Sequence, residues 1–170
     1  CNVRTEHVIS APDVANIYGL PTEFHGEGLD SAVVSLLNIW SREPDLGPWT
    51  KLLETALSPK GEVTIGIVGK YVDLAESYKS LNEALIHGGL ANQRTVNLKF
   101  VDAEKLERGE LDDLKSVDGI LVPGGFGKRG VEGKIVASRY AREKKIPYFG
   151  ICLGMQIAVI EFARHVAGFS

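Results

Sequence analysis

The sequence has few cysteines, few aromatic residues and no long hydrophobic run. Its two cysteines lie far apart among 170 residues, which argues against a disulfide framework and favours reduced thiols in a cytoplasmic protein. No apolar stretch approaches the roughly 20 residues that a membrane-spanning helix needs, and no secretory leader is visible. A net charge of −3 gives no basic surface for nucleic acid. We therefore expect a globular protein with no nucleic-acid or membrane partner.

Residues 1–45 differ in pattern from the rest of the chain. Short apolar groups are separated by turn-forming residues, and helical spacing is confined to 29–40. Residues 46–61 are rich in proline and glycine and predict a linker that carries a short helix near 49–57. Because the chain opens with cysteine, we expect an excerpt from a longer protein.

From residue 62 onward, strands and helices alternate. We expect strands at 63–71, 95–101, 119–122 and 146–151, with helices at 77–87 (stopped by the two following glycines), 106–115, 131–144 and 153–167. This alternation predicts an α/β fold, a parallel sheet with helices on both faces. In such sheets, ligands bind at the carboxyl ends of the strands.

The stretch "GICLG" places Cys152 between two glycines at the end of the fourth strand. A strand that turns sharply into a helix lifts the turn residue above the sheet, and its close neighbours must be small. The following helix would favour the thiolate and would offer the Leu153 amide to an oxyanion. The glycine-rich "PGGFG" (123–127) ends the preceding strand and could supply a second amide. The alternative is a buried cysteine that acts only as a small hydrophobe.

The motifs "GICLGMQ" and "LVPGGFG" resemble the class I glutamine amidotransferase domain, whose strand order is flavodoxin-like. The longer segments "YKSLNEALIHGG", "VPGGFGKRGVEGK" and "IPYFGICLGMQIAVIEFAR" are similar to the CTP synthase family, and "VISAPDVANIYGLP" resembles the end of its P-loop-type synthetase domain. The resemblance implies three segments: 1–45 from the synthetase domain, 46–61 as interdomain linker, and 62–170 from the amidotransferase domain.

The resemblance also implies an activity. The family makes CTP from UTP with ATP and Mg²⁺, uses ammonia from glutamine, is activated by GTP and assembles as a homotetramer. Cys152 would be the nucleophile. The other implied roles are the oxyanion hole and glutamine contacts (Gly125, Leu153, Gly154, Met155, Gln156), ATP binding (Asp13, Val14) and a GTP-linked role (Arg129). No residue of this chain is expected to bind metal.

One part of the family pattern is missing from this sequence. The family's base is a His-x-Glu far downstream of the cysteine, and here only 18 residues follow Cys152. Neither His165 nor His87 is expected to replace it, and His7 and His25 have no partner nearby in sequence that suggests acid–base work. We therefore expect this chain alone to be an incomplete fragment that does not turn over glutamine.

Other interpretations stay open at this point. "GICLGMQ" is shared by other triad amidotransferases. A cysteine hydrolase of similar fold would carry a similar nucleophile elbow, the sharp strand-to-helix turn that presents the cysteine. A flavodoxin-like binding module with an inert cysteine belongs to a different class, as does a role in subunit assembly. Ordinary backbone angles and a buried sulfur at Cys152 would favour the inert module.

Overall fold

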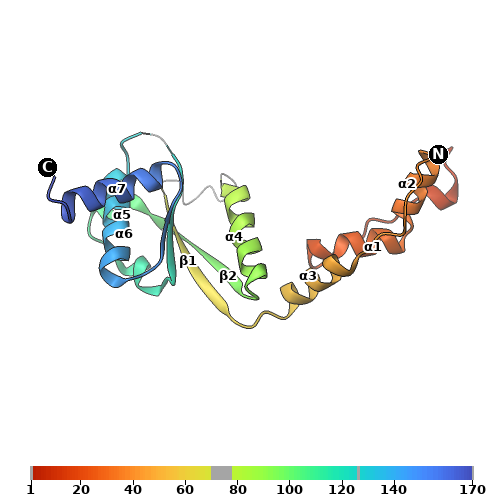
Figure 1. Ribbon diagram of the computed structural model, residues 1–170, viewed down its shortest axis with the longest axis horizontal. Helices are drawn as coiled ribbons and strands as arrows, with labels where there is room; N and C mark the ends of the chain where they lie inside the picture. Colours follow the sequence, from red (N-terminus) through yellow and green to blue (C-terminus); the bar gives the residue numbers. More distant parts are fainter. Residues whose placement is uncertain (1, 70–77, 126, 170) are drawn as a thin grey trace. The chain divides into compact units, whose positions relative to one another are not determined.

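The structure is a computed structural model that describes residues 2–69, 78–125 and 127–169. The chain packs as two compact units, Cys1–Pro59 and Lys60–Ser170 (Figure 1). The predicted strand end at Tyr71, the predicted helix start at Ser77, and Phe126 of the glycine loop lie outside the described residues.

The first unit consists of short helices. These are the 3-10 turns η1 (Thr5–His7) and η2 (Ile17–Gly19) and the helices α1 (Leu20–Gly26), α2 (Leu29–Leu36) and α3 (Gly47–Leu57). Helix α2 ends before the predicted residue 40, and Asn38 just beyond it has a left-handed φ of 52°. Helix α3 starts at Gly47 and Pro48, a residue suited to a first helical position, and it contacts η2 and α1. The proline-rich stretch therefore packs as part of this unit.

The second unit contains a four-stranded sheet. Its strands are β1 (Glu62–Gly69), β2 (Thr95–Asp102), β3 (Gly119–Val122) and β4 (Tyr148–Gly150). All neighbouring strands are parallel, in the order β2-β1-β3-β4. The predicted parallel sheet in flavodoxin-like order is therefore confirmed, and it brings the ends of β3 and β4 side by side.

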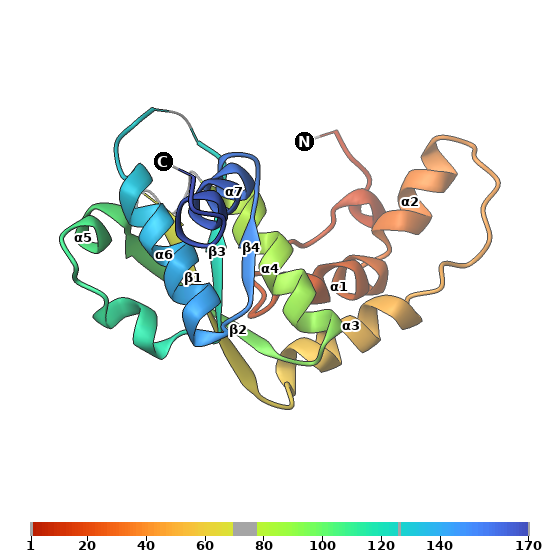
Figure 2. The same cartoon turned by 60° about the vertical axis from the view of Figure 1, so that its left-hand side comes forward.

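Helices cover both faces of this sheet (Figures 1 and 2). Helix α4 (Lys79–Ala91) lies on one face, while α5 (Ala103–Glu107), α6 (Val131–Lys144) and α7 (Leu153–His165) lie on the other. The main core fills the space beneath α5 and α6, because alternate side chains of each strand point to that face. Its fully buried members include Val68, Val101, Ile120, Val122, Leu106, Leu114, Ala137 and Ala141.

The prediction that two glycines stop the first helix of this unit is wrong. Helix α4 continues through Gly88 and Gly89 to Ala91. A β-carbon at Gly89 would lie 2.5 Å from Val96 Cγ2 and 2.7 Å from the carbonyl oxygen of Arg94. Gly89 therefore allows α4 to approach β2 closely, and it does not end the helix.

The predicted helix over 106–115 is also wrong. The chain instead forms α5, capped by the Asp102 carboxylate on the Glu104 amide at 2.8 Å, and then the 3-10 turn η4 (Asp112–Ser116). Between them Gly109 has φ of 85°, a left-handed conformation that ends a helix. The helix over 131–144 and the strand over 119–122 have the predicted bounds.

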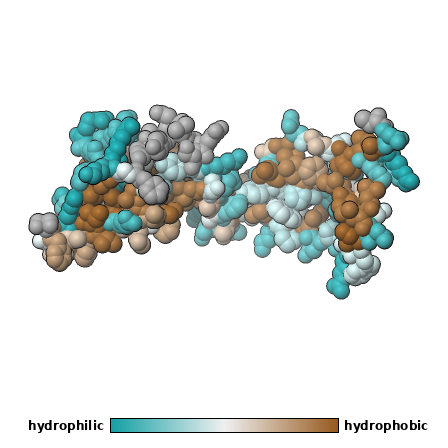
Figure 3. All heavy atoms as spheres, turned by 90° about the horizontal axis from the view of Figure 1, so that it is seen from above, coloured by the Kyte–Doolittle hydropathy of each residue, from teal (hydrophilic) through white to brown (hydrophobic). Residues whose placement is uncertain are grey.

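None of the helices in the described residues is long and apolar enough to cross a membrane. Hydrophobic side chains are nevertheless exposed on both units, as the brown surface in Figure 3 shows. On the second unit they include Phe149 on β4 and Met155, Val159 and Phe162 on α7. These four exposed side chains lie on β4 and on α7, the helix that follows it.

Candidate functional site

Cys152 forms a sharp turn between β4 and α7. Its φ of 52° and ψ of −105° lie outside the favoured regions for a residue with a β-carbon. The residue is exposed and its thiol is free. These two observations match a nucleophile elbow and count against an inert, buried cysteine.

The glycines on either side of Cys152 are required by close backbone contacts. A β-carbon at Gly150 would lie 2.3 Å from the carbonyl carbon of Gly154. One at Gly154 would lie 2.0 Å from the carbonyl oxygen of Val122 at the end of β3. The elbow can therefore be this tight only if both positions lack a side chain.

Tyr148 fixes the elbow from β4. Its hydroxyl donates a hydrogen bond of 2.8 Å to the carbonyl oxygen of Gly154 in the first turn of α7. Burial raises the pKa of Tyr148 to about 12, partly offset by a hydrogen bond with Ser138 of α6. The neutral phenol thus links α6, β4 and the start of α7.

The glycine loop after β3 lies next to the elbow. A β-carbon at Gly124 would lie 3.5 Å from Cys152 Cβ, and one at Gly125 would lie 3.9 Å from Leu153 Cδ2. The backbone amide of Ile151 donates to the carbonyl oxygen of Val122 at 3.0 Å, which joins the two strand ends. The structure therefore brings together the two segments that the sequence singled out.

The first turn of α7 contains the other predicted glutamine contacts. Leu153 is its first residue, where backbone N–H groups have no acceptor within the helix. Gly154 is buried, whereas Met155 and Gln156 are exposed on the surface near the thiol. The Gln156 amide donates to the Cys152 carbonyl oxygen at 3.2 Å and so continues the helix from the elbow.

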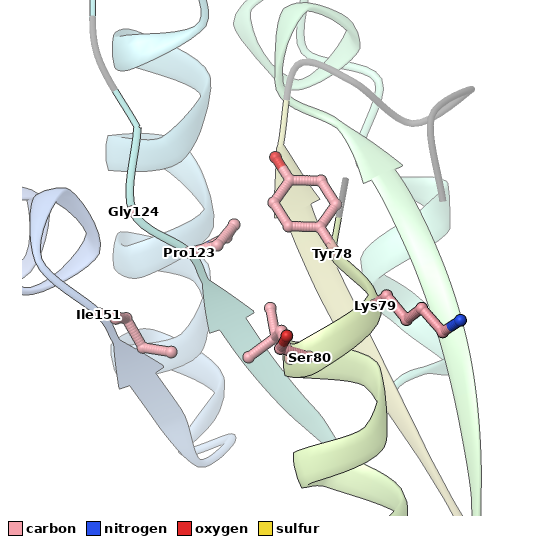
Figure 4. A pocket seen from close by; sticks show the side chains of 7 residues that line it. Tyr78, Lys79, Ser80, Pro123, Gly124 and Ile151 are labelled. Atoms are coloured by element: carbon pink, nitrogen blue, oxygen red, sulfur yellow. The ribbon is translucent and has the colours of Figure 1, made fainter. Parts of the chain in front are cut away.

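A hollow of about 400 Å³ opens beside the elbow (Figure 4). Tyr78 and Ser80 at the start of α4 face Pro123 and Ile151 across it, while the Lys79 side chain points away. Gly124 and Leu81 complete the lining. Sequence reasoning missed the start of α4, although a helix that follows the first strand of a parallel sheet begins at the same edge as the other strand ends.

Arg129, predicted for a GTP-linked role, lies two residues before α6 and forms an ion pair with Glu104 of α5. The guanidinium holds the pKa of the Glu104 carboxyl below its usual value. The structure does not place Arg129 among the residues that line the hollow.

The predicted ATP-binding residues lie in the first unit. Asp13 and Val14 line a separate hollow of about 380 Å³ together with Asn16, Glu23 and Leu53. Helix α3 therefore supplies part of the wall of this hollow, a contribution that the sequence did not indicate.

His165 and His25 have local partners. His165, at the end of α7, lies about 20 Å along the helix from the elbow at about 1.5 Å per residue. Its Nδ1 is 3.1 Å from the Glu161 carbonyl oxygen. The expectation for His25 needs correction, because its Nδ1 lies 2.7 Å from Asp30 Oδ2, and this bond lowers the pKa of Asp30. That pair joins α1 to α2 in the first unit.

No group of three or more His, Cys, Asp or Glu side chains that could hold a metal ion occurs among the described residues. The site at the elbow therefore consists of a thiol, backbone amides and an adjacent hollow.

Comparison with known proteins gives consistent matches. The CTP synthase of Desulfotalea psychrophila is 62% identical over 171 residues, which cover 100% of this chain and 31% of that protein. The CTP synthase of Syntrophus aciditrophicus is 59% identical over 169 residues, 99% of this chain and 31% of that protein. The chain thus spans about a third of the length of these curated relatives.

A solved structure, the glutaminase domain of Trypanosoma brucei CTPS with bound acivicin, matches with a TM-score of 0.57 and 45% identity. The match covers 62% of this chain and 42% of that one. The family model for glutamine amidotransferase class-I matches residues 73–168, more than half of the chain and the part that holds the elbow. The chain therefore belongs to the class-I glutamine amidotransferase family.

Proposed function

We propose that this chain provides the nucleophile and the oxyanion hole of the glutaminase site in a CTP synthase. The observation that carries the proposal is the exposed Cys152 in its left-handed conformation, next to Gly124 and Gly125. Identities of 62% and 59% to CTP synthases over the whole chain support this family member over other amidotransferases.

The proposed reaction starts with attack of the Cys152 thiolate on the side-chain amide carbon of glutamine. The carbon–sulfur bond forms while the carbonyl π electrons move to oxygen. When the tetrahedral intermediate collapses, the carbon–nitrogen bond breaks, the nitrogen takes a proton and ammonia leaves. Water then attacks the glutamyl thioester, which gives glutamate and restores the thiol.

Backbone amides stabilise the negative oxygen in this scheme. One donor is the backbone amide of Leu153 at the start of α7. The other is the backbone amide of Gly125 in the glycine loop, which lies near the Leu153 side chain. Preorganised donors of this kind lower the barrier by roughly 3 kcal/mol each. The hollow between α4 and Pro123 gives glutamine room next to Ile151, the residue that precedes Cys152.

Proton transfer needs a base in addition to these groups. The family resemblance assigns it to a downstream His-x-Glu, and His165 is bound to Glu161 at the far end of α7. We therefore propose that a polypeptide of residues 1–170 shows no glutamine turnover above background.

The remaining family properties are proposals about the whole protein to which this chain belongs. They comprise amination of UTP with ATP and Mg²⁺, activation by GTP near Arg129, ATP binding at Asp13 and Val14, a homotetramer and a cytoplasmic location. The proposed segments are a synthetase end (1–45), a linker (46–61) and an amidotransferase part (62–170). The amination half, which uses Mg²⁺ and ATP, involves no step at Cys152.

The first experiment measures ammonia release from glutamine by the full-length protein. We expect activity that is abolished by Cys152→Ala, and an acivicin adduct on the peptide that contains Cys152. Cys152→Ser, with a smaller and less acidic nucleophile, should retain the fold and lose turnover. Undiminished glutaminase activity in Cys152→Ala would overturn the proposal.

A second measurement separates CTP synthase from other amidotransferases. The full-length protein should convert UTP to CTP with ATP, Mg²⁺ and either glutamine or free ammonia. In Cys152→Ala only the ammonia-dependent reaction should persist. Glutamine hydrolysis without any amination of UTP would support a different class-I amidotransferase.

A further inference from the structure

Lys134 is a buried cation next to the glycine loop. Only 3% of the residue is exposed, and its Nζ lies 4.0 Å from the point that a Gly125 β-carbon would occupy. It stands in the first turn of α6, where the positive end of the helix disfavours a cation. Burial of an ammonium costs several kcal/mol unless neighbouring groups compensate it. Its position beside Gly125 makes the glycine loop an element on which the lysine can act.

The first turn of α6, which carries Lys134, packs closely against α5. A β-carbon at the preceding Gly133 would lie 1.7 Å from the carbonyl oxygen of Ala103, so α6 sits directly against α5. The Gly133 amide also donates to the Glu107 carboxylate at 3.4 Å. The first turn of α6, from which the Lys134 side chain extends toward the loop, is thus fixed against α5 by these contacts.

The same face of α6 reaches the other wall of the site. Ser138, one turn after Lys134, is buried and hydrogen-bonds to Tyr148, whose hydroxyl donates to the Gly154 carbonyl oxygen. Helix α6 therefore approaches the glycine loop with Lys134 and is linked to the first turn of α7 through Ser138 and Tyr148. These are the segments that carry the two proposed oxyanion donors.

We propose that Lys134 is a positioning residue for the oxyanion hole. Its ammonium holds the backbone of Gly124–Gly125 so that the Gly125 amide faces the substrate oxygen when the tetrahedral intermediate forms. This inference rests on the proposed glutaminase function and adds a residue that does not touch the substrate. Loss of the ammonium should affect the transition state more than the binding of glutamine.

The test compares Lys134→Met, Lys134→Arg and the control Lys144→Met, on the exposed last turn of the same helix, in the full-length protein. For Lys134→Met we expect glutaminase kcat to fall about 10- to 100-fold with KM changed by less than about threefold. Lys134→Arg, which keeps the charge, should recover part of kcat. Lys144→Met should behave as the wild type.

Two probes separate positioning from a structural role. The first probe is glutamate γ-semialdehyde. The Cys152 thiol adds to its aldehyde carbon, and the former aldehyde oxygen then occupies the oxyanion hole. The inhibition constant of this aldehyde should rise in parallel with the loss of kcat. Iodoacetamide alkylates the thiol without an oxyanion, so its rate should stay unchanged.

The proposal is overturned if Lys134→Met keeps wild-type kcat and aldehyde affinity, or if iodoacetamide alkylation falls in parallel with turnover. If Lys134→Met does not fold, Lys134→Gln, which also removes the charge, decides. A loss of kcat together with a loss of aldehyde affinity supports positioning, and wild-type values of both refute it. Failure of the proposed function would look different, because the wild type would then release no ammonia or Cys152→Ala would remain active.

Discussion

The two units of the chain bury their hydrophobic residues to very different extents. Among the described residues, every buried hydrophobic side chain lies in the second unit, and Gly19 is the single buried residue of the first. In the first unit Trp40 is 83% exposed and Leu36 is 63% exposed. Since apolar burial is the main source of folding free energy, the second unit has its own core and the first unit gains little. Burial therefore predicts where substitutions matter.

The largest difference is expected from a matched pair of glycines. Gly133→Ala would place a methyl group 1.7 Å from the Ala103 carbonyl oxygen and should destabilise the second unit by roughly 3 kcal/mol. Gly26→Ala, in α1, meets nothing within 4 Å and should stabilise its helix by about 0.5 kcal/mol. Urea denaturation followed by far-UV circular dichroism measures the first change.

Tryptophan fluorescence reports on the first unit alone, because Trp40 and Trp49 are the only two tryptophans of the chain. Gly26→Ala should move its midpoint to higher urea, and Gly133→Ala should leave it in place. Equal destabilisation by both substitutions would contradict the division of stability between the units.

A second pair compares the same side chain in both units. Leu106→Ala removes a leucine that is 1% exposed in the core beneath α5 and should cost about 2–5 kcal/mol. Leu36→Ala removes a leucine that is 63% exposed at the end of α2 and should cost less than about 0.5 kcal/mol. A cost at Leu36 comparable to that at Leu106 would show that the first unit has a core of its own.

The smallest expected effect concerns alkaline pH and the elbow. Because the pKa of Tyr148 is raised from 10.0 to about 12, its stabilising contribution is complete below pH 10 and is lost as pH rises through 12. Tyr148→Phe should lower stability at neutral pH by about 1 kcal/mol, the value of one hydrogen bond, and should flatten this alkaline loss. Thermal melts at several pH values between about 9 and 12 measure both effects. An unchanged alkaline slope in the variant would assign the loss to other groups.

Much of the second unit could be predicted because its signals are local. The spacing of apolar residues located β3 and α6 with their observed bounds, and strand–helix alternation predicted the parallel sheet. The glycines around Cys152 predicted the elbow, since a turn of that shape leaves no room for β-carbons. The same local rules failed at Gly88 and Gly89, where contact with β2 outweighs the tendency of glycine to end a helix.

The candidate site could be predicted only in part. Cys152 and the glycine loop stand at the ends of neighbouring strands, so the sequence indicated both of them. The approach of Tyr78 and Ser80, at the start of α4, and the bond from Tyr148 to Gly154 depend on how distant segments pack. No pattern within one segment reports such approaches.

The sequence by itself determined that a thiol would stand on a tight turn at the end of a parallel strand, because glycine spacing and apolar periodicity act over a few neighbouring residues. Only the tertiary structure decided what lies near that turn: the adjacent glycine loop, the hollow lined by the start of α4, and the buried ammonium of Lys134 near Gly125 of the loop. The physical reason is the separation along the chain over which each property is determined. Backbone conformation follows from adjacent residues, whereas burial and contact follow from how distant segments pack.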